Sequence, residues 1–175
     1  MFVLFRAITY ASLFIAVVLV YFPARVLAWA GISRPAAMEW PQLLGLVVGT
    51  AGAALAIWCV LVFAWIGRGT PAPFDPPRKL VVRGPYRYVR NPMYIGATTA
   101  LIGAAAFYQS VALAVFGALF FFTTHLFAVI YEEPTLRRSF GSEYEAYCRS
   151  VRRWWPRFHA AAGSDGALSA QNPRA

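Results

Sequence analysis

The chain has 175 residues, of which 59% are hydrophobic and 13% are charged. A soluble domain usually carries about 25% charged residues, so this composition excludes an ordinary soluble enzyme, whose surface would need more polar groups. The net charge of +9 would suggest nucleic acid as the partner of a soluble protein. In so apolar a chain it indicates instead the excess of cations on the cytoplasmic side of a membrane protein. We expect an integral membrane protein with no nucleic acid partner.

Four apolar segments have about the length of a transmembrane helix, which needs about 20 apolar residues. They cover residues 7–30, 43–66, 93–107 and 111–131. Pro23 and Arg25 interrupt the first segment, whereas the second carries no charge. The last two are joined by Tyr108-Gln109-Ser110, a short polar turn that suits antiparallel helices. The fold class we predict is therefore all-α, with four transmembrane helices and a C-terminal helical hairpin.

The charges predict how these helices cross the membrane. Residues 67–91 contain six arginines or lysines and one aspartate, and six more arginines lie between Arg137 and Arg157. Cation-rich loops stay on the cytoplasmic side. Both regions should therefore be cytoplasmic, which gives a multi-pass protein with both termini inside.

Three parts of the chain are expected to differ in role. Residues 1–66 would form the N-terminal transmembrane helices, residues 67–158 a functional region of loop, hairpin and C-terminal helix, and residues 159–175 a flexible tail. Arg6 with Ala28-Trp29-Ala30 also resembles a signal peptide and its cleavage site. Because the apolar stretch is longer than such signals usually have, we favour its retention as the first helix.

Small residues predict close helix contacts in the membrane. Gly45 and Gly49 form a GxxxG pattern on the second apolar segment, and a small-residue stripe on the third contains Gly96, Ala100, Gly103 and Ala104. Such residues let helix backbones approach closely. We interpret both patterns as packing surfaces.

The start of the third apolar segment is the first candidate functional region. Asn91 followed by Pro92 is typical of a helix start, with Asn91 as N-cap. The unpaired backbone N–H groups of a helix start bind anions. Arg87 and Arg90 would strengthen such a site, or serve only as cytoplasmic anchors.

The end of the fourth apolar segment is the second candidate. Glu132 and Glu133 directly follow the apolar run, where carboxylates are costly and unusual. His125 lies two helical turns before Glu132 and should share its face. It is either a functional residue or a hydrogen-bonding partner between helices.

The third candidate is an amphipathic helix near the C-terminus. Ser142 and Glu145 form a capping-box pattern, and an apolar stripe follows at Tyr144, Tyr147, Cys148 and Val151. The aromatic pair Trp154-Trp155 suits a membrane interface. We expect a cytoplasmic helix lying on the membrane, held by a short tether over the same mouth as the Asn91 helix start.

Together these motifs resemble a known family. Gly84-Pro85-Tyr86-Arg87, the run from Arg90 to Gly96, Glu132-Glu133-Pro134-Thr135-Leu136, and Phe140-Gly141 with Tyr144, Tyr147 and Arg153 occur in this order. The pattern, spanning about residues 69–156, resembles the isoprenylcysteine carboxyl methyltransferase-like membrane proteins, which are related to the phospholipid N-methyltransferases.

The resemblance implies an S-adenosylmethionine-dependent methyltransferase whose donor binds at the cytoplasmic side. The residues that would bind the donor are Tyr86, Asn91, Pro92, Tyr94, Gly96, His125, Glu132, Glu133, Tyr144 and Tyr147. The candidate catalytic residues are Glu133, Arg137 and Arg153, with one of the two arginines orienting the substrate. No metal is expected, because Cys59 and Cys148 lack the spacing of a zinc site and the methyl of a sulfonium is already reactive.

The substrate and the activity itself have alternatives. Asn91 stands where many prenylcysteine enzymes have histidine, and an asparagine can hydrogen-bond but cannot act as a general base. The acceptor could therefore be the carboxylate of a prenylcysteine-like molecule or a phospholipid amine. A non-enzymatic membrane protein, such as a small transporter or an assembly factor, is the other class. Polar groups gathered at one mouth favour the enzyme over a conduit, and the oligomeric state stays open.

Overall fold

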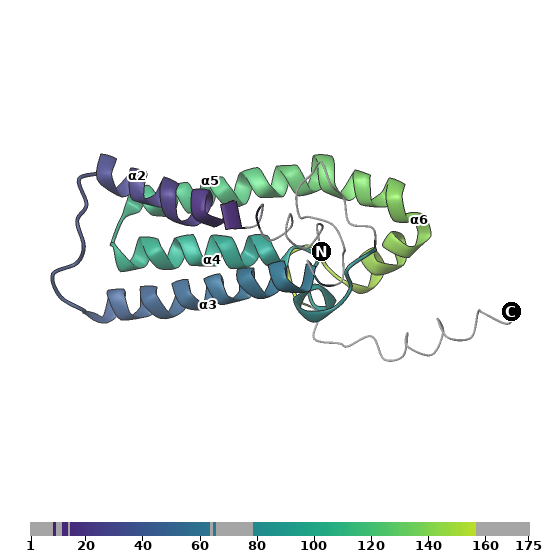
Figure 1. Cartoon of the computed structure of the whole chain (residues 1–175), viewed down its shortest axis with the longest axis horizontal. Helices are drawn as coiled ribbons and strands as arrows, with labels where there is room; N and C mark the ends of the chain where they lie inside the picture. The colour runs from purple at the N-terminus through teal and green to yellow at the C-terminus, as the bar shows by residue number, and fades with distance from the viewer. Residues whose placement is uncertain (1–8, 10–11, 14, 64, 66–78, 157–175) are drawn as a thin grey trace, which may run out of the picture.

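The computed structural model describes residues 9, 12–13, 15–63, 65 and 79–156 (Figure 1). Within these residues the chain is helical and has no strand, so the all-α prediction is confirmed. The elements in chain order are η1 (Ala16–Tyr21), α2 (Phe22–Trp29), α3 (Trp40–Val62), η3 (Gly84–Arg87), α4 (Pro92–Phe107), α5 (Val111–Phe127), η4 (Ala128–Glu132) and α6 (Glu133–Ser150). The proline-rich part of the predicted loop and the predicted tail lie outside the described residues.

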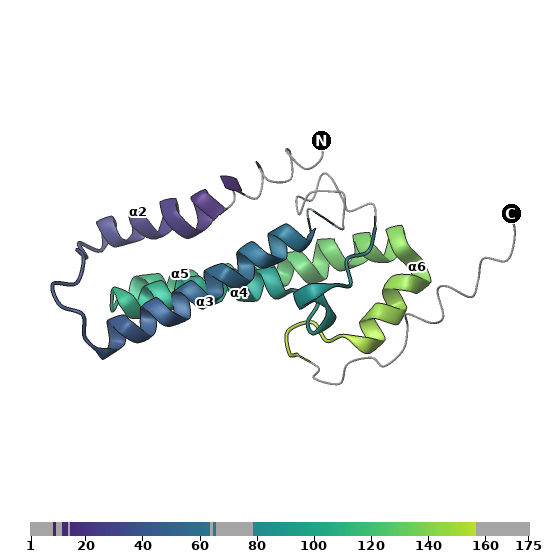
Figure 2. The same ribbon diagram turned by 60° about the horizontal axis from the view of Figure 1, so that its bottom comes forward.

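The helices form an elongated bundle with a compact cap at one end. Helices α3, α4 and α5 run along the long axis, α3 packing on α4 and α4 on α5 (Figure 1). Helix α2 contacts α5 and stands beside the bundle in the second view (Figure 2). Helix α6 turns back at the far end of α5 (Figure 2). One end of the bundle therefore lies beside α6, and the other lies beside the loop before α3.

Glycines bring α3 and α4 into backbone contact. A Cβ added to Gly103 would collide with the backbone of Gly49, and one added to Gly96 would lie 2.7 Å from the backbone nitrogen of Ala56. Gly45 of α3 meets the backbone of Phe107 in the same way. The small-residue patterns thus form one packing surface, as the sequence predicts.

The hairpin between α4 and α5 has the predicted turn. Helix α4 ends at Phe107, and Gln109 adopts a left-handed conformation with φ of 49°. The Ser110 hydroxyl accepts a hydrogen bond of 3.2 Å from the backbone N–H of Leu113, which caps α5. The start of α4 and the end of α5 therefore lie at the same end of the bundle, next to α6.

Two helices are long and apolar enough to cross a membrane, namely Trp40–Val62 and the continuous helix Val111–Ser150. The two other apolar helices, Ala16–Trp29 and Pro92–Phe107, are shorter. The first of these continues past Pro23, because a π-turn precedes it and the Phe22 N–H bonds to the carbonyl of Val17. Helices in all four predicted segments are confirmed, while the crossing of all four stays a prediction.

Helix α6 consists of two helical parts that meet at a kink at Gly141, so the second part begins where the capping-box pattern predicts a helix start. Helix α6 begins at Glu133, continuous with α5 through the π-turn η4, and bends at Gly141, where φ is 48°. Ser142 directly follows this kink at the start of the second helical part, and the Glu145 carboxylate pairs with Arg137. Glycine supplies the left-handed conformation at the bend without steric cost, so α6 folds back over the end of the bundle.

Candidate functional site at the polar end of the bundle

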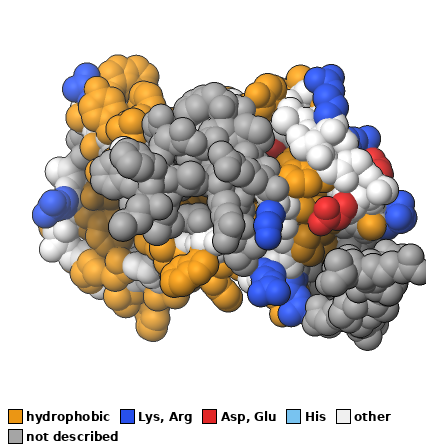
Figure 3. Space-filling view, turned by 45° about the vertical axis from the view of Figure 1, so that its right-hand side comes forward, with side chains coloured by type: hydrophobic (Ala, Val, Ile, Leu, Met, Phe, Trp, Pro, Cys, Tyr) orange, Lys and Arg blue, Asp and Glu red, His pale blue; other side chains and the backbone are white. Residues whose placement is uncertain are grey.

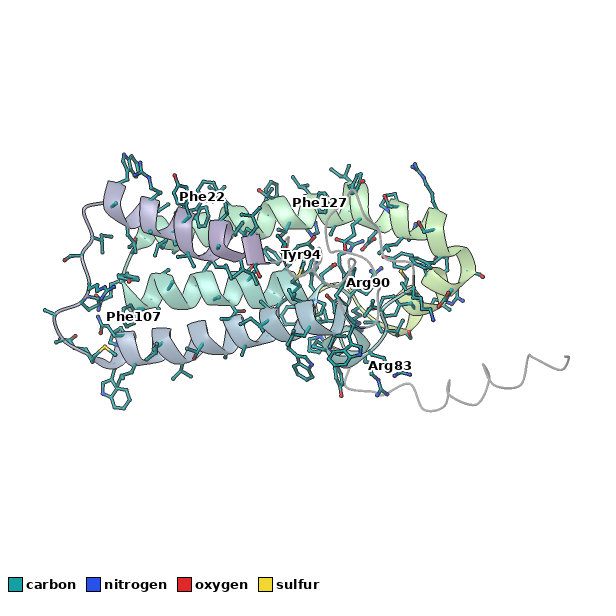
Figure 4. The ribbon with its side chains drawn as sticks, viewed as in Figure 1. Phe22, Arg83, Arg90, Tyr94, Phe107 and Phe127 are labelled. Carbon is teal, nitrogen blue, oxygen red and sulfur yellow. The ribbon has the colours of Figure 1, made fainter. Side chains whose placement is uncertain are left out.

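Three segments that are distant in sequence meet at the end of the bundle that carries α6. They are the start of α4, the junction of η4 with α6, and the chain after α6. The backbone N–H of Arg90 donates to the carbonyl of Arg152 at 2.9 Å, and Val89 forms a parallel bridge with Arg152. Arg90 and Tyr94 lie at this end of α4, and Phe107 at the other (Figure 4). We call the place where these three segments meet the polar end.

Glu133 is the buried centre of the polar end. Its carboxylate accepts two hydrogen bonds from Arg153, at 2.6 Å from Nε and 2.8 Å from Nη2. Arg90 Nη1 lies 3.5 Å from the same carboxylate. The hydrogen bonds to Glu133 raise the pKa of Arg153 above its ordinary value, so this side chain stays charged. Two arginines around one carboxylate leave the trio with one excess positive charge.

Arg90 and Asn91 retain hydrogen-bond donors that nothing in the described structure accepts. Arg90 Nη1 donates to Cys148 Sγ at 2.7 Å, whereas Arg90 Nε and Asn91 Nδ2 are buried without a partner among the described residues. Asn91 is the N-cap of α4, as predicted, but its side chain makes no cap hydrogen bond. The amide is therefore available for another group.

Tyrosines line the neighbouring part of the polar end. The Tyr94 hydroxyl donates to Glu132 at 3.2 Å, and the Tyr147 hydroxyl donates to the backbone carbonyl of Tyr86 at 2.7 Å. Burial raises the pKa of Tyr86 well above its ordinary value, so this phenol stays protonated. The π-turn η4 sets Glu132 beside Tyr94; such turns are frequent at functional sites.

The apolar stripe of α6 packs against the protein itself. Tyr144, Tyr147 and Val151 are buried together. The partly buried residues packed against them are Leu80, Leu136, Phe140 and Cys148. The sequence suggested a helix lying on the membrane, but the stripe instead forms the core of the polar end.

His125 and Trp154 join the C-terminal segment to α5. The indole N–H of Trp154 donates to His125 Nδ1 at 3.1 Å, and the ring of Trp154 lies 4.9 Å from that of Phe121. His125 is therefore a hydrogen-bond partner here, which was one of its two predicted roles. Trp154 is thus tied to the bundle, whereas its neighbour Trp155 is 74% exposed.

The structure separates some of the predicted site residues from the cluster. Arg137 pairs with Glu145 at 3.1 Å, and both side chains are about half exposed. Gly96 faces α3 as a packing residue, and Pro92 is buried at the start of α4.

Sequence reasoning missed Cys148 and Trp154 as contacts of the polar end. No local pattern could reveal them, because their partners Arg90 and His125 are distant in sequence.

The surface follows the same division into two ends. Hydrophobic side chains cover the bundle, and most charged side chains visible in Figure 3 gather over the end that carries α6. The exposed apolar residues include Leu44, Val47 and Trp58 of α3 and Val115, Leu119 and Phe122 of α5. Among the residues that the structure describes, no group of three His, Cys, Asp or Glu residues could hold a metal ion.

Comparisons with known proteins point to one family and two relatives. A model of the phospholipid methyltransferase family matches residues 40–143. The nickel-cobalt-cadmium resistance protein NccN of Alcaligenes xylosoxydans xylosoxydans is 29% identical over 129 residues, which are 74% of this chain and 54% of the relative. The cobalt-zinc-cadmium resistance protein CzcN of Cupriavidus metallidurans is 29% identical over 128 residues, 71% of this chain and 55% of the relative.

The chain thus spans about half the length of these curated relatives. No solved structure matches it. The family match covers α3, α4, α5 and most of α6, and therefore includes the start of α4 and both glutamates of the polar end. The apolar helices agree with a membrane protein. The chain belongs to the phospholipid methyltransferase family.

Proposed function

We propose that the chain is an S-adenosylmethionine-dependent methyltransferase that acts on a lipophilic substrate at the cytoplasmic face of a membrane. The observation that carries the proposal is the cluster of buried carboxylates, arginines and tyrosines at one end of an apolar bundle. The start of α4 and both glutamates of this cluster lie inside the region that matches the family. The arginines around the polar end agree with four membrane crossings that place this end on the cytoplasmic side.

The residues of the polar end fit the methyl donor. S-adenosylmethionine carries a sulfonium, an ammonium and a carboxylate. Tyr94 and Glu132 offer an aromatic ring and a carboxylate to the positive groups. The unpartnered donors of Arg90 and Asn91 offer hydrogen bonds to the negative group. Glu133 is already committed to two arginines, so we assign it to holding the site together.

The chain's own residues position and shield the reactants. When bound, the donor supplies a methyl group made reactive by its positively charged sulfur. In-line alignment then accounts for most of the required catalysis. The paired Glu133 and Arg153 fix the C-terminal segment over the start of α4, and the buried Tyr144 and Tyr147 keep water away from that side.

The bundle suits an acceptor that arrives from the membrane. The exposed faces of α3 and α5 are apolar and would contact lipid, so a lipophilic molecule can reach the polar end from the side. A carboxylate acceptor needs no base, whereas an amine must first lose a proton. Both a prenylcysteine-like carboxylate and a phospholipid amine remain within the proposal.

The test is transfer of a radiolabelled methyl group from S-adenosylmethionine to extractable lipids by membranes containing the protein. Glu132→Gln removes one carboxylate charge from the polar end, and Glu145→Gln removes one from the exposed face of α6 as the matched control. We expect labelled lipid with the wild type and the control, and little with Glu132→Gln. Absence of label with folded wild-type protein across lipid extracts would contradict the proposal.

The names of the two relatives raise metal handling as a second candidate. Titration of the purified protein with Cd²⁺ and Co²⁺ separates the two functions. The methyltransferase proposal predicts binding of the methyl donor and no stoichiometric metal binding by the wild type. Stoichiometric metal binding without donor binding would favour direct metal handling.

A further inference from the structure

We infer that an exposed surface beside the polar end binds the headgroups of anionic phospholipids. The residues of this basic surface are Arg83, Arg87, Tyr88, Arg152 and Trp155. Figure 4 shows Arg83 at this end of the molecule, projecting away from the bundle. The partner is the membrane that surrounds the helices, so the inference goes beyond the proposed function and does not depend on methyl transfer.

The basic surface is formed by two segments that the backbone holds side by side. Residues 83–88 lie in and around η3, and residues 152–155 follow α6. The backbone N–H of Arg90 donates to the carbonyl of Arg152 at 2.9 Å, and Val89 forms a bridge with Arg152. Cations from both segments therefore contribute to one surface.

The positive charge of the basic surface has no counter-charge in the described protein. Its three arginines are exposed, and none has an ion-pair partner among the residues that the structure describes. The surrounding segments, residues 79–91 and 146–156, contain no aspartate or glutamate. Their inward arginines, Arg90 and Arg153, are the ones that pair with Glu133. The outward arginines thus suit an anionic partner from outside the chain.

Tryptophans on α3 mark the two boundaries of the hydrocarbon core. Trp40 at one end of the helix and Trp58 near the other are both exposed. Trp58 follows Trp40 by 18 residues, which span about 27 Å of helix. The hydrocarbon core of a bilayer is about 30 Å thick, and tryptophan is enriched at both of its interfaces. One boundary therefore lies near Trp58.

Contacts with α3 set the basic surface at the level of the lipid headgroups. A Cβ added to Gly84 would lie 3.8 Å from the indole nitrogen of Trp58 and 3.1 Å from Val62. The rings of Phe63 and Tyr86 lie 6.3 Å apart. The segment η3 thus packs on the last turns of α3, at the boundary that Trp58 marks. Arginines at this depth are within reach of lipid phosphates.

Exposed aromatic rings favour lipid over a soluble anion as the partner. Trp155 is 74% exposed and Tyr88 is 48% exposed, whereas Trp154 is bonded to His125. A soluble phosphate ion would engage the arginines and leave these rings in water. At a membrane interface the rings lie among headgroups and acyl chains while the arginines contact phosphates. An anionic lipid surface accounts for both kinds of side chain.

The test measures lipid selectivity by electron paramagnetic resonance in phosphatidylcholine nanodiscs. Spin-labelled phosphatidylglycerol and phosphatidylcholine have the same acyl chains, but only the former has a net negative charge. We expect the wild type to immobilise phosphatidylglycerol about fivefold more strongly, because arginines near a membrane surface attract anionic lipid. High salt should reduce this preference by screening. Equal immobilisation of the two lipids by the wild type would overturn the inference.

The decisive variant combines Arg87→Gln with Arg152→Gln and so removes one cation from each segment. The matched control combines Arg25→Gln with Arg34→Gln, which removes the same charge from exposed positions in α2 and in the loop before α3. We expect the first variant to reduce the preference to about twofold or less and the control to keep it. Equal reductions would overturn the inference, because the preference would then reflect total charge.

A competition experiment separates the lipid from free phosphate. Glycerol 3-phosphate has a phosphate group and no acyl chain. We expect phosphatidylglycerol to stay immobilised when glycerol 3-phosphate is added at the same salt concentration. Displacement would overturn the lipid as the partner. Neither result depends on binding of the methyl donor, so failure of this inference and failure of the proposed function are distinguishable.

Discussion

The two ends of the molecule are held together by different interactions. Along α3 and α4, glycines place backbone directly against backbone, and the contact needs no charged group. At the polar end, Arg90 and the partly exposed Arg153 form a charged cluster around the buried Glu133, with hydrogen-bonded tyrosine hydroxyls nearby. The bundle is therefore sensitive to added volume, and the polar end to lost charge or hydrogen bonds.

This difference separates scaffold from site. Close packing of small residues is how membrane helices associate without a hydrophobic force between them. Buried charges, by contrast, are costly and are retained where they are paired or functional. The predictions below change one region at a time, so that the two kinds of sensitivity can be compared.

The largest effect is expected from Glu133→Gln, which leaves Arg90 and Arg153 without their buried counter-charge. Breaking a buried ion pair costs about 3–5 kcal/mol, and we expect the lower half of that range because Arg153 is partly exposed. Thermal unfolding in detergent measures the loss. A change below about 1 kcal/mol, the range of exposed pairs, would show that the cluster does not hold the polar end together.

The next effect is expected from Gly103→Ala in the bundle. The new methyl group would collide with the backbone of Gly49, and overpacking of this kind costs about 1–3 kcal/mol. Gly117→Ala is the control, because its methyl would meet side-chain atoms and no backbone within 4 Å, the nearest being the flexible end of Ile102 at 3.2 Å and the Cβ of Leu101 at 3.4 Å. Equal stability of the two variants would contradict the close contact of α3 with α4.

A smaller effect is expected from Tyr147→Phe. The change removes the hydrogen bond of 2.7 Å to the carbonyl of Tyr86 while keeping the ring, and it should cost about 1–2 kcal/mol. Hydrogen exchange of residues 84–91 should rise if the bond anchors this segment to α6. Unchanged exchange there would show that the segment is held by other contacts.

The smallest effect is expected from Arg137→Ala. Arg137 and Glu145 are about half exposed, and exposed ion pairs contribute about 0–1 kcal/mol. Methyl transfer should stay near the wild-type rate, because the structure places no contact between Arg137 and the polar end among the described residues. A loss of activity comparable to that of Glu132→Gln would show that Arg137 belongs to the functional site, as the family resemblance implies.

Sequence patterns predicted the framework well, because they depend on local properties. The length of the hydrophobic segments predicted the apolar helices, the three-residue polar turn predicted the hairpin, and Asn91-Pro92 predicted the start of α4. The three candidate regions also meet at one end, which follows from the topology of the hairpin and from the bend at Gly141 in the helix that continues α5.

The partners within the site could not be predicted in the same way. The sequence offered Arg137 and Arg153 equally, and only the bend at Gly141 and the return of the chain decide which of them reaches Glu133. Likewise, the aromatic pair Trp154-Trp155 indicated a membrane interface, whereas Trp154 bonds to His125. Such pairings depend on tertiary geometry rather than on local pattern.

The most direct test of the central claim is calorimetric binding of S-adenosylmethionine to the wild-type protein in nanodiscs. We predict one site per chain with affinity in the micromolar range, competition by S-adenosylhomocysteine, and loss of binding in Glu132→Gln but not in Glu145→Gln. Folded wild-type protein that binds no donor, or a Glu132→Gln variant that binds it unchanged, would contradict the placement of the site at the polar end.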